Sequence, residues 1–139
     1  MKEEYIDAFR GIIVDTQTTS GYELPVDLEA YIVLLLASHV EKTEFLPKDS
    51  FAETYLSLKN KHTAKELGDT CLFVSGVFPE YGSKHGLSRR YYIDIGTSSY
   101  SIVAGKISGE LFSQLSTHFN FLSDFINVAC NSKKIKSIF

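Results

Sequence analysis

Apolar side chains recur every three or four residues along most of this chain, which is the spacing of amphipathic helices. The first such segment runs from about Glu4 to Thr18 and ends in a polar run before Gly21, a residue suited to a turn. One face of this expected helix carries Tyr5, Phe9, Ile12, Ile13 and Thr16.

A second helix is expected over residues 26–41. Proline is tolerated in a first turn, as at Pro25, and Asp27 and Glu29 complement the positive end of a helix dipole. Between Leu28 and Val40 the segment is apolar on nearly all sides. Because helices of that kind are buried, we expect this one to be the central helix of the fold.

Three more segments carry helical signals. A short helix follows Pro47, with Asp49 or Ser50 as its cap. A longer helix spans about Thr63 to Phe78 and stops before a proline. The final helix is the clearest, because one face repeats Leu111, Leu115, His118, Leu122, Phe125 and Ala129.

The sequence of residues 91–104 is compatible with two structures: a short β-hairpin around the GTSS turn, or a helix capped by Ser88. We favour the helix, because its small residues would face small residues of the preceding helix and let the two axes approach. This interpretation predicts a close helix contact formed by Gly68, Ser75, Gly76, Gly96 and Ser99. The sequence thus predicts an all-α single domain of five to six helices over residues 1–131, with a basic C-terminal tail at 132–139.

The segment DIGTSS, residues 94–99, resembles the phosphate-binding hairpin of actin-like ATPases and sugar kinases. That resemblance implies nucleotide binding, but such proteins need two α/β lobes, and only 34 residues follow Gly105 here. We therefore reject it. Residues 67–104, with GDTCLFVSGVFPEYG and SRRYYIDIGTSSY, are also similar to uncharacterised bacterial proteins of unassigned function, which implies no chemistry.

Composition narrows the function classes. The 139 residues are 44% hydrophobic and 22% charged, the balance of a folded soluble domain, and the net charge of −3 argues against nucleic-acid binding. The longest apolar run, Ala30 to Ala37, is too short for a bilayer. Cys71 and Cys130 lie in apolar surroundings without metal-binding spacing, which indicates buried reduced thiols in a cytoplasmic protein.

The loop 80-EYGSKHGLSRR-90 holds the one basic concentration in the ordered part of the sequence. The free N–H groups of a helix that starts at Ser88, together with two arginines, could bind a phosphate or carboxylate. The competing interpretation is a solvated loop whose arginines pair with Glu80 or Asp94. The candidate anion-binding residues are Lys84, His85, Ser88, Arg89 and Arg90.

Histidines suggest two weaker sites. His62, Glu66 and Asp69 would share one helix face and could hold a metal, but no second ligand pair accompanies them. His39 and His118 could be axial haem ligands, although core or boundary histidines are far commoner. We therefore expect no metal and no cofactor.

The function expected from these features is that of a small, self-associating interaction or adaptor protein. Phe121 lies beside Phe125 but off the main stripe, so apolar groups cover more than one face of the last helix, as is common where a helix meets a partner. We expect a homodimer without catalysis, since no G-x-S-x-G nucleophile elbow is present. The alternative is a ligand-binding protein or enzyme with the anion site at 84–90 and an apolar pocket between the helices near 68–76 and 92–103.

Overall fold

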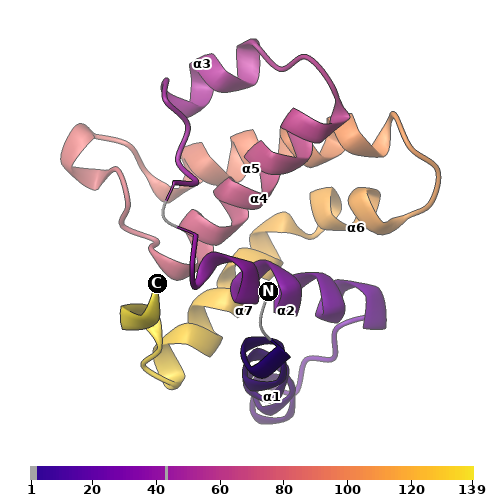
Figure 1. Ribbon diagram of the computed structural model, residues 1–139, viewed down its shortest axis with the longest axis vertical. Coiled ribbons are helices and arrows are strands. Elements are labelled where there is room, and N and C mark those ends of the chain that lie inside the picture. The colour runs from indigo at the N-terminus through magenta and orange to yellow at the C-terminus, as the bar shows by residue number, and fades with distance from the viewer. Residues whose placement is uncertain (1–2, 43) are drawn as a thin grey trace.

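The computed structural model describes residues 3–42 and 44–139 (Figure 1). These residues form seven α-helices and two short 3₁₀ turns, joined by loops. No strand occurs in these residues, so the all-α prediction is confirmed and the β-hairpin alternative at 91–104 is wrong. The helices are α1 (Glu3–Ser20), α2 (Val26–His39), α3 (Phe51–Leu56), α4 (Lys61–Val77), α5 (Arg89–Ala104), α6 (Leu111–Thr117) and α7 (Phe119–Ser132), with η1 (Ser83–His85) before α5 and η2 (Lys136–Ile138) after α7.

Helix α4 is the most enclosed element, since eleven of its 17 residues are buried. It packs against α2, α3, α5 and α7, and it lies beside α5 in the upper half of Figure 1. Helix α2, which the sequence places at the centre, packs against α1, α4 and α6. On its outer side Val26 and Leu34 are exposed. The core therefore lies between α4 and its neighbours, and it also includes Phe9 and Ile13 of α1.

Side-chain caps fix where two of the helices begin. Ser50 accepts the Glu53 backbone N–H at 3.1 Å and starts α3, so Ser50 rather than Asp49 is the cap. At the start of α4 the side-chain Oδ1 of Asn60 accepts the Thr63 backbone N–H at 3.0 Å, and Thr63 Oγ1 accepts the Asn60 backbone N–H at 3.3 Å. This reciprocal pair satisfies two donors that the helix itself cannot.

The long C-terminal helix expected from the sequence is divided at His118, so the prediction of five to six helices is corrected to seven among the described residues. His118 has φ −103° and ψ 15°, outside the helical region. The chain turns there because α6 packs along α5, whereas α7 continues along α4. His118 is exposed as a result, although the periodicity put it on the apolar face.

The last residues fold back onto the helices. The Phe139 ring stacks on Phe9 of α1 with the ring centres 5.8 Å apart and meets Phe73 of α4 edge-on at 5.0 Å. Part of the segment predicted as a basic tail therefore contacts the core. Among the described residues, no helix combines the length and the hydropathy that a membrane span requires.

Candidate functional site

A cleft of about 590 Å³ opens between the α4–α5 loop, the start of α3 and the start of α5. The loop projects from the body at the left of Figure 1. The volume lies within the range of small-molecule pockets. The lining residues are Leu46, Pro47, Asp49, Ser50, Phe51, Glu80, Tyr81, Gly82, Ser83, Lys84, His85, Leu87, Tyr91 and Tyr92.

Two glycines shape the loop that forms one wall. Gly82 and Gly86 flank η1 with φ of 84° and 74°, a region that side chains disfavour. A Cβ at Gly82 would also collide with the Tyr92 hydroxyl. The turn is closed by the His85 and Leu87 N–H groups, which both donate to the Gly82 carbonyl at 2.9 and 3.1 Å. The loop is therefore held in one shape by backbone bonds.

Aromatic rings form the floor of the cleft. The Tyr92 ring meets Phe51 and Tyr91 edge-on, each with centres 4.9 Å apart, and Tyr81 at 5.5 Å. Burial raises the pKa of Tyr92, and the hydroxyls of Tyr81 and Tyr91 add to the rise, so Tyr92 stays neutral. Tyr91 Oη accepts the Ala52 backbone N–H at 3.0 Å and keeps its own proton for another acceptor.

The cleft mouth carries charges of both signs. Asp49 and Glu80 are exposed there, and so are Lys84 and His85 of η1. None of these four side chains has an ion-pair or side-chain hydrogen-bond partner within the described ranges 3–42 and 44–139. They are free to meet a ligand.

The structure does not bring all five predicted anion-binding residues together. Lys84 and His85 line the cleft, but Ser88, Arg89 and Arg90 do not. Ser88 precedes α5 without a side-chain capping bond. Arg90 lies 3.8 Å from Asp94 on the exposed face of α5, as the solvated-loop interpretation has it.

Arg89 instead joins three helices. Its Nε donates to the Ser75 carbonyl at 3.0 Å, Nη2 donates to Ser123 Oγ at 2.6 Å, and Nη1 lies 2.7 Å from an oxygen of Asp124. The Asn127 amide donates to the Gly76 carbonyl at 3.0 Å. Because the last carbonyls of a helix lack partners within it, Arg89 and Asn127 together complete the C-terminal end of α4.

The three residues considered as weak candidates for a metal site separate into two groups. His62 Nε2 pairs with Glu66 at 2.9 Å in solvent. Asp69 turns inward and accepts the hydroxyls of Tyr31 at 2.6 Å and Tyr100 at 2.7 Å, and its other oxygen accepts Lys65 Nζ at 2.8 Å. In the part of the chain that the structure describes, no group of three histidine, cysteine or acidic side chains is arranged to hold a metal.

Asp69 is thus a partly buried polar centre that joins α2, α4 and α5. Burial raises the pKa of Tyr31 and of Tyr100, and the negative charge of Asp69 raises both further, so the two hydroxyls remain donors. A second, smaller cleft of about 320 Å³ reaches Asp69 past Tyr31 and Lys65. The i, i+4 pair Lys65–Asp69 is visible in the sequence, but nothing local indicates the tyrosines.

Side chains from other helices pack against the small residues of α4 and α5. A Cβ at Gly68 would lie 2.6 Å from the Tyr100 ring, and one at Gly76 would lie 2.8 Å from Ile126. Gly96 is overlaid by the Phe119 ring and by Cys71 Cβ. Of the two serines, Ser75 Oγ accepts from Ser123 at 2.8 Å, and Ser99 Oγ donates to the Ile95 carbonyl at 2.8 Å.

The space between residues 68–76 and 92–103 is consequently filled. Both cysteines, Cys71 on α4 and Cys130 on α7, are buried and inert. Burial raises the pKa of Cys71 and raises that of Cys130 to about 12, so both are neutral thiols at physiological pH.

Of the two histidines considered as haem ligands, His118 is exposed and His39 is buried. The His39 ring stacks on Phe73 with centres 4.1 Å apart, and its Nδ1 bonds to the Leu35 carbonyl at 2.8 Å. Its Nε2 is buried without a partner among the described residues.

Comparison with known proteins adds no relative: no family model, no curated protein and no solved structure matches this chain.

Proposed function

We propose that this chain is a small helical interaction protein of the cytoplasm that self-associates through the outer face of α2 and catalyses no reaction. The observation that carries the proposal is the composition of that face. No Asp, Glu, Lys or Arg occurs between Glu29 and Glu41, although Ala30 and Leu34 point to solvent. A surface helix normally places charges on its outer side, and an outer side without them is typical of an interface.

The shape of the face suits a helix from a second copy. Leu34, 46% exposed, lies between two grooves, one toward α1 past Ile6 and Arg10 and one toward α4 past Tyr31 and Lys65. One turn earlier stands the small Ala30. In a two-fold arrangement Leu34 of each copy can pack over Ala30 of the other, ridge into groove. In such a dimer α2 would be the central buried helix.

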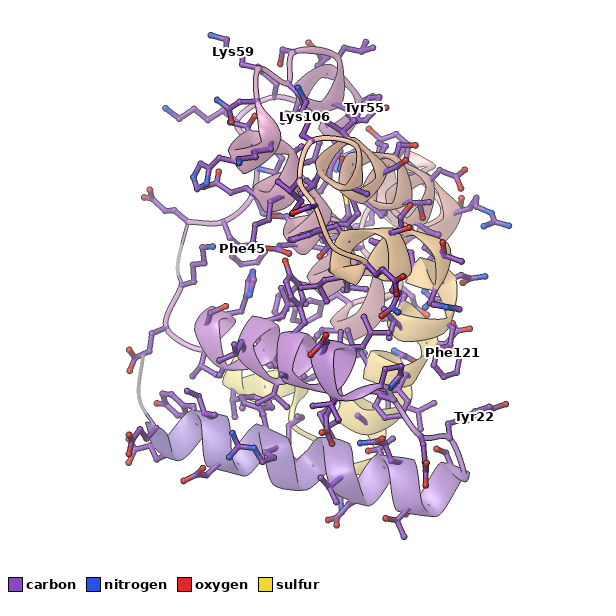
Figure 2. All side chains as sticks on the ribbon, turned by 90° about the vertical axis from the view of Figure 1, so that its right-hand side faces the viewer. Tyr22, Phe45, Tyr55, Lys59, Lys106 and Phe121 are labelled. Atoms are coloured by element: carbon purple, nitrogen blue, oxygen red, sulfur yellow. The ribbon has the colours of Figure 1, made fainter. Side chains whose placement is uncertain are left out.

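The last helix is a weaker surface for a partner. Phe121 of α7 is partly covered by Tyr22, whose ring meets it edge-on with centres 5.2 Å apart, as their neighbouring positions in Figure 2 show. This intramolecular contact accounts for the apolar residue that lies off the stripe of α7.

Sedimentation equilibrium tests the proposal with Leu34→Glu and its matched control Leu56→Glu, which changes an 82% exposed leucine on α3. We expect a dimer with a dissociation constant in the micromolar range, weakened at least tenfold by Leu34→Glu and unchanged by Leu56→Glu. A strict monomer at about a hundred times that concentration overturns the proposal.

One observation favours a second function, a ligand-binding protein or enzyme with an anion site at residues 84–90. Lys84 and His85 line the cleft of about 590 Å³ and are unpaired among the described residues. Native mass spectrometry of the purified protein for bound small molecules tests it. An apo mass together with no thermal shift from phosphate or carboxylates counts against it.

A further inference from the structure

The cleft at the α4–α5 loop combines an aromatic floor with separate positive and negative groups, and this combination specifies a ligand more narrowly than an anion site does. Tyr81, which is exposed, and Tyr91, which is half-buried, line the cleft together with the buried rings of Phe51 and Tyr92. Planar ligands pack well on such rings, because edge-to-face and offset contacts add to the burial of apolar area.

The charges around these rings do not favour a simple anion. Asp49 and Glu80 contribute two negative charges and Lys84 one positive charge, so these three side chains sum to a net charge of −1. A phosphate or a lone carboxylate would be repelled by the two acids, and a lone organic cation would be repelled by Lys84. A molecule with one charge of each sign can satisfy both.

We propose that this cleft binds a small aromatic zwitterion of the chemical class of the free aromatic α-amino acids. The ligand's ring lies against Tyr81 and Tyr91, its ammonium group faces Asp49 and Glu80, and its carboxylate faces Lys84 and His85. Tyr91 Oη adds a donor, since its proton is not used by the bond from Ala52. The proposal deepens the second function given above and is independent of self-association through α2.

Three probes that differ by one charged group test the inference: L-phenylalanine, 3-phenylpropionate without the ammonium group, and phenethylamine without the carboxylate. In ¹⁵N–¹H titrations of the full chain, L-phenylalanine is expected to shift the amides of residues 80–87 with a dissociation constant of about 1 mM or below. Each analogue is expected to bind at least tenfold more weakly.

Other outcomes separate this inference from the function on which it rests. If 3-phenylpropionate binds as tightly as L-phenylalanine, the cleft is a plain anion site, and the zwitterion inference fails while the second function stands. If phenethylamine binds as tightly, the inference fails and an organic-cation site replaces it. If none of the three shifts these amides, the inference fails, and a titration with phosphate then decides the anion site separately.

Two surface variants then assign the charges. Lys84→Gln should abolish the preference for L-phenylalanine over phenethylamine, and Glu80→Gln should abolish the preference over 3-phenylpropionate. The control is Lys106→Gln, because Lys106 lies beyond the far end of α5 and near Lys59 at the end of the molecule opposite α1 (Figure 2). If both preferences survive in variants that melt like the parent protein, the assignment of these side chains is overturned.

Discussion

The hydroxyl of Tyr100 on α5 donates a hydrogen bond of 2.7 Å to the carboxylate of Asp69 on α4, and this carboxylate oxygen also accepts the hydroxyl of Tyr31 on α2. One acidic side chain thereby holds three helices. Its remaining oxygen is occupied by Lys65, so the partly buried charge is both paired and hydrogen-bonded.

Replacing Asp69 should therefore cost more than replacing one of its donors. We expect Asp69→Ala to lower the free energy of unfolding by about 3–5 kcal/mol, because two tyrosine hydroxyls and Lys65 lose their acceptor. Tyr100→Phe should cost about 1–2 kcal/mol. Urea denaturation measures both, with Tyr22→Phe at an exposed ring as the control. Equal, small changes in the free energy of unfolding for all three variants would contradict the conclusion that Asp69 links the three helices.

Glycine-to-alanine substitutions should change stability in opposite directions at two helical positions. At Gly96 the added methyl collides with the Phe119 ring and lies 2.7 Å from Cys71 Cβ, so we expect a loss of about 1–3 kcal/mol. At Gly11, in the middle of α1, nothing lies within 4 Å, so the better helix propensity of alanine should stabilise by about 0.5–1 kcal/mol. Thermal melts of the pair suffice, and a stabilised Gly96→Ala would show that the packing is looser.

His39 should make stability fall on acidification. Burial lowers its pKa and Lys42 acts in the same direction, against the bond to the Leu35 carbonyl and the charge of Asp69. Below the ordinary value of 6.5 the unfolded chain binds a proton that the folded chain does not, so stability is full above that pH and declines below it. The slope from this one group reaches at most about 1.4 kcal/mol per pH unit.

The pH test compares the parent protein with His39→Phe, which keeps a ring in the stack. Between pH 6.5 and 5.5 the variant should lose the part of the slope that His39 contributes, in urea denaturation at each pH. Identical slopes in the two proteins would refute the assignment.

Arg89 and Arg90 are neighbours in sequence with different expected effects. Arg89→Ala should destabilise by about 2–4 kcal/mol, because the Ser75 carbonyl and Asp124 lose a charged donor. Arg90→Ala removes a long, exposed pair and should change stability by less than about 0.5 kcal/mol. Chemical denaturation distinguishes the two. If Arg89→Ala were harmless, the guanidinium would be available for a ligand after all.

Local signals predicted the helices but not the contacts between distant elements. Asn60 and Thr63 are three residues apart, so their capping box can be read from the sequence. The break at His118 has no proline or glycine to mark it, because packing against two different helices sets it there. Helical spacing groups Asp69 with His62 and Glu66, whereas one of its hydrogen-bond partners, Tyr31, stands 38 residues away.

The same limit applies to the candidate site. The glycines and basic residues of the 80–90 loop indicate a functional loop, and the loop does border the cleft of about 590 Å³. The sequence could not show that Arg89 is occupied by Ser123, 34 residues further on. Nor could it show that Asp49 and Tyr91 come to the same cleft, because that depends on how α3 packs against α5.

The completion of α4 by Arg89 and Asn127 has a consequence for how the chain reaches its fold. The two side chains lie 14 and 51 residues beyond the carbonyls they bind. The last turn of α4 cannot acquire all its hydrogen bonds until α7 has docked, so it should form after the folding transition state. In a kinetic analysis of folding mutants, substitutions in this turn should change the unfolding rate much more than the folding rate, which corresponds to low φ-values. In a chain still being synthesised, this end of the most enclosed helix would fray until the final helix had been made.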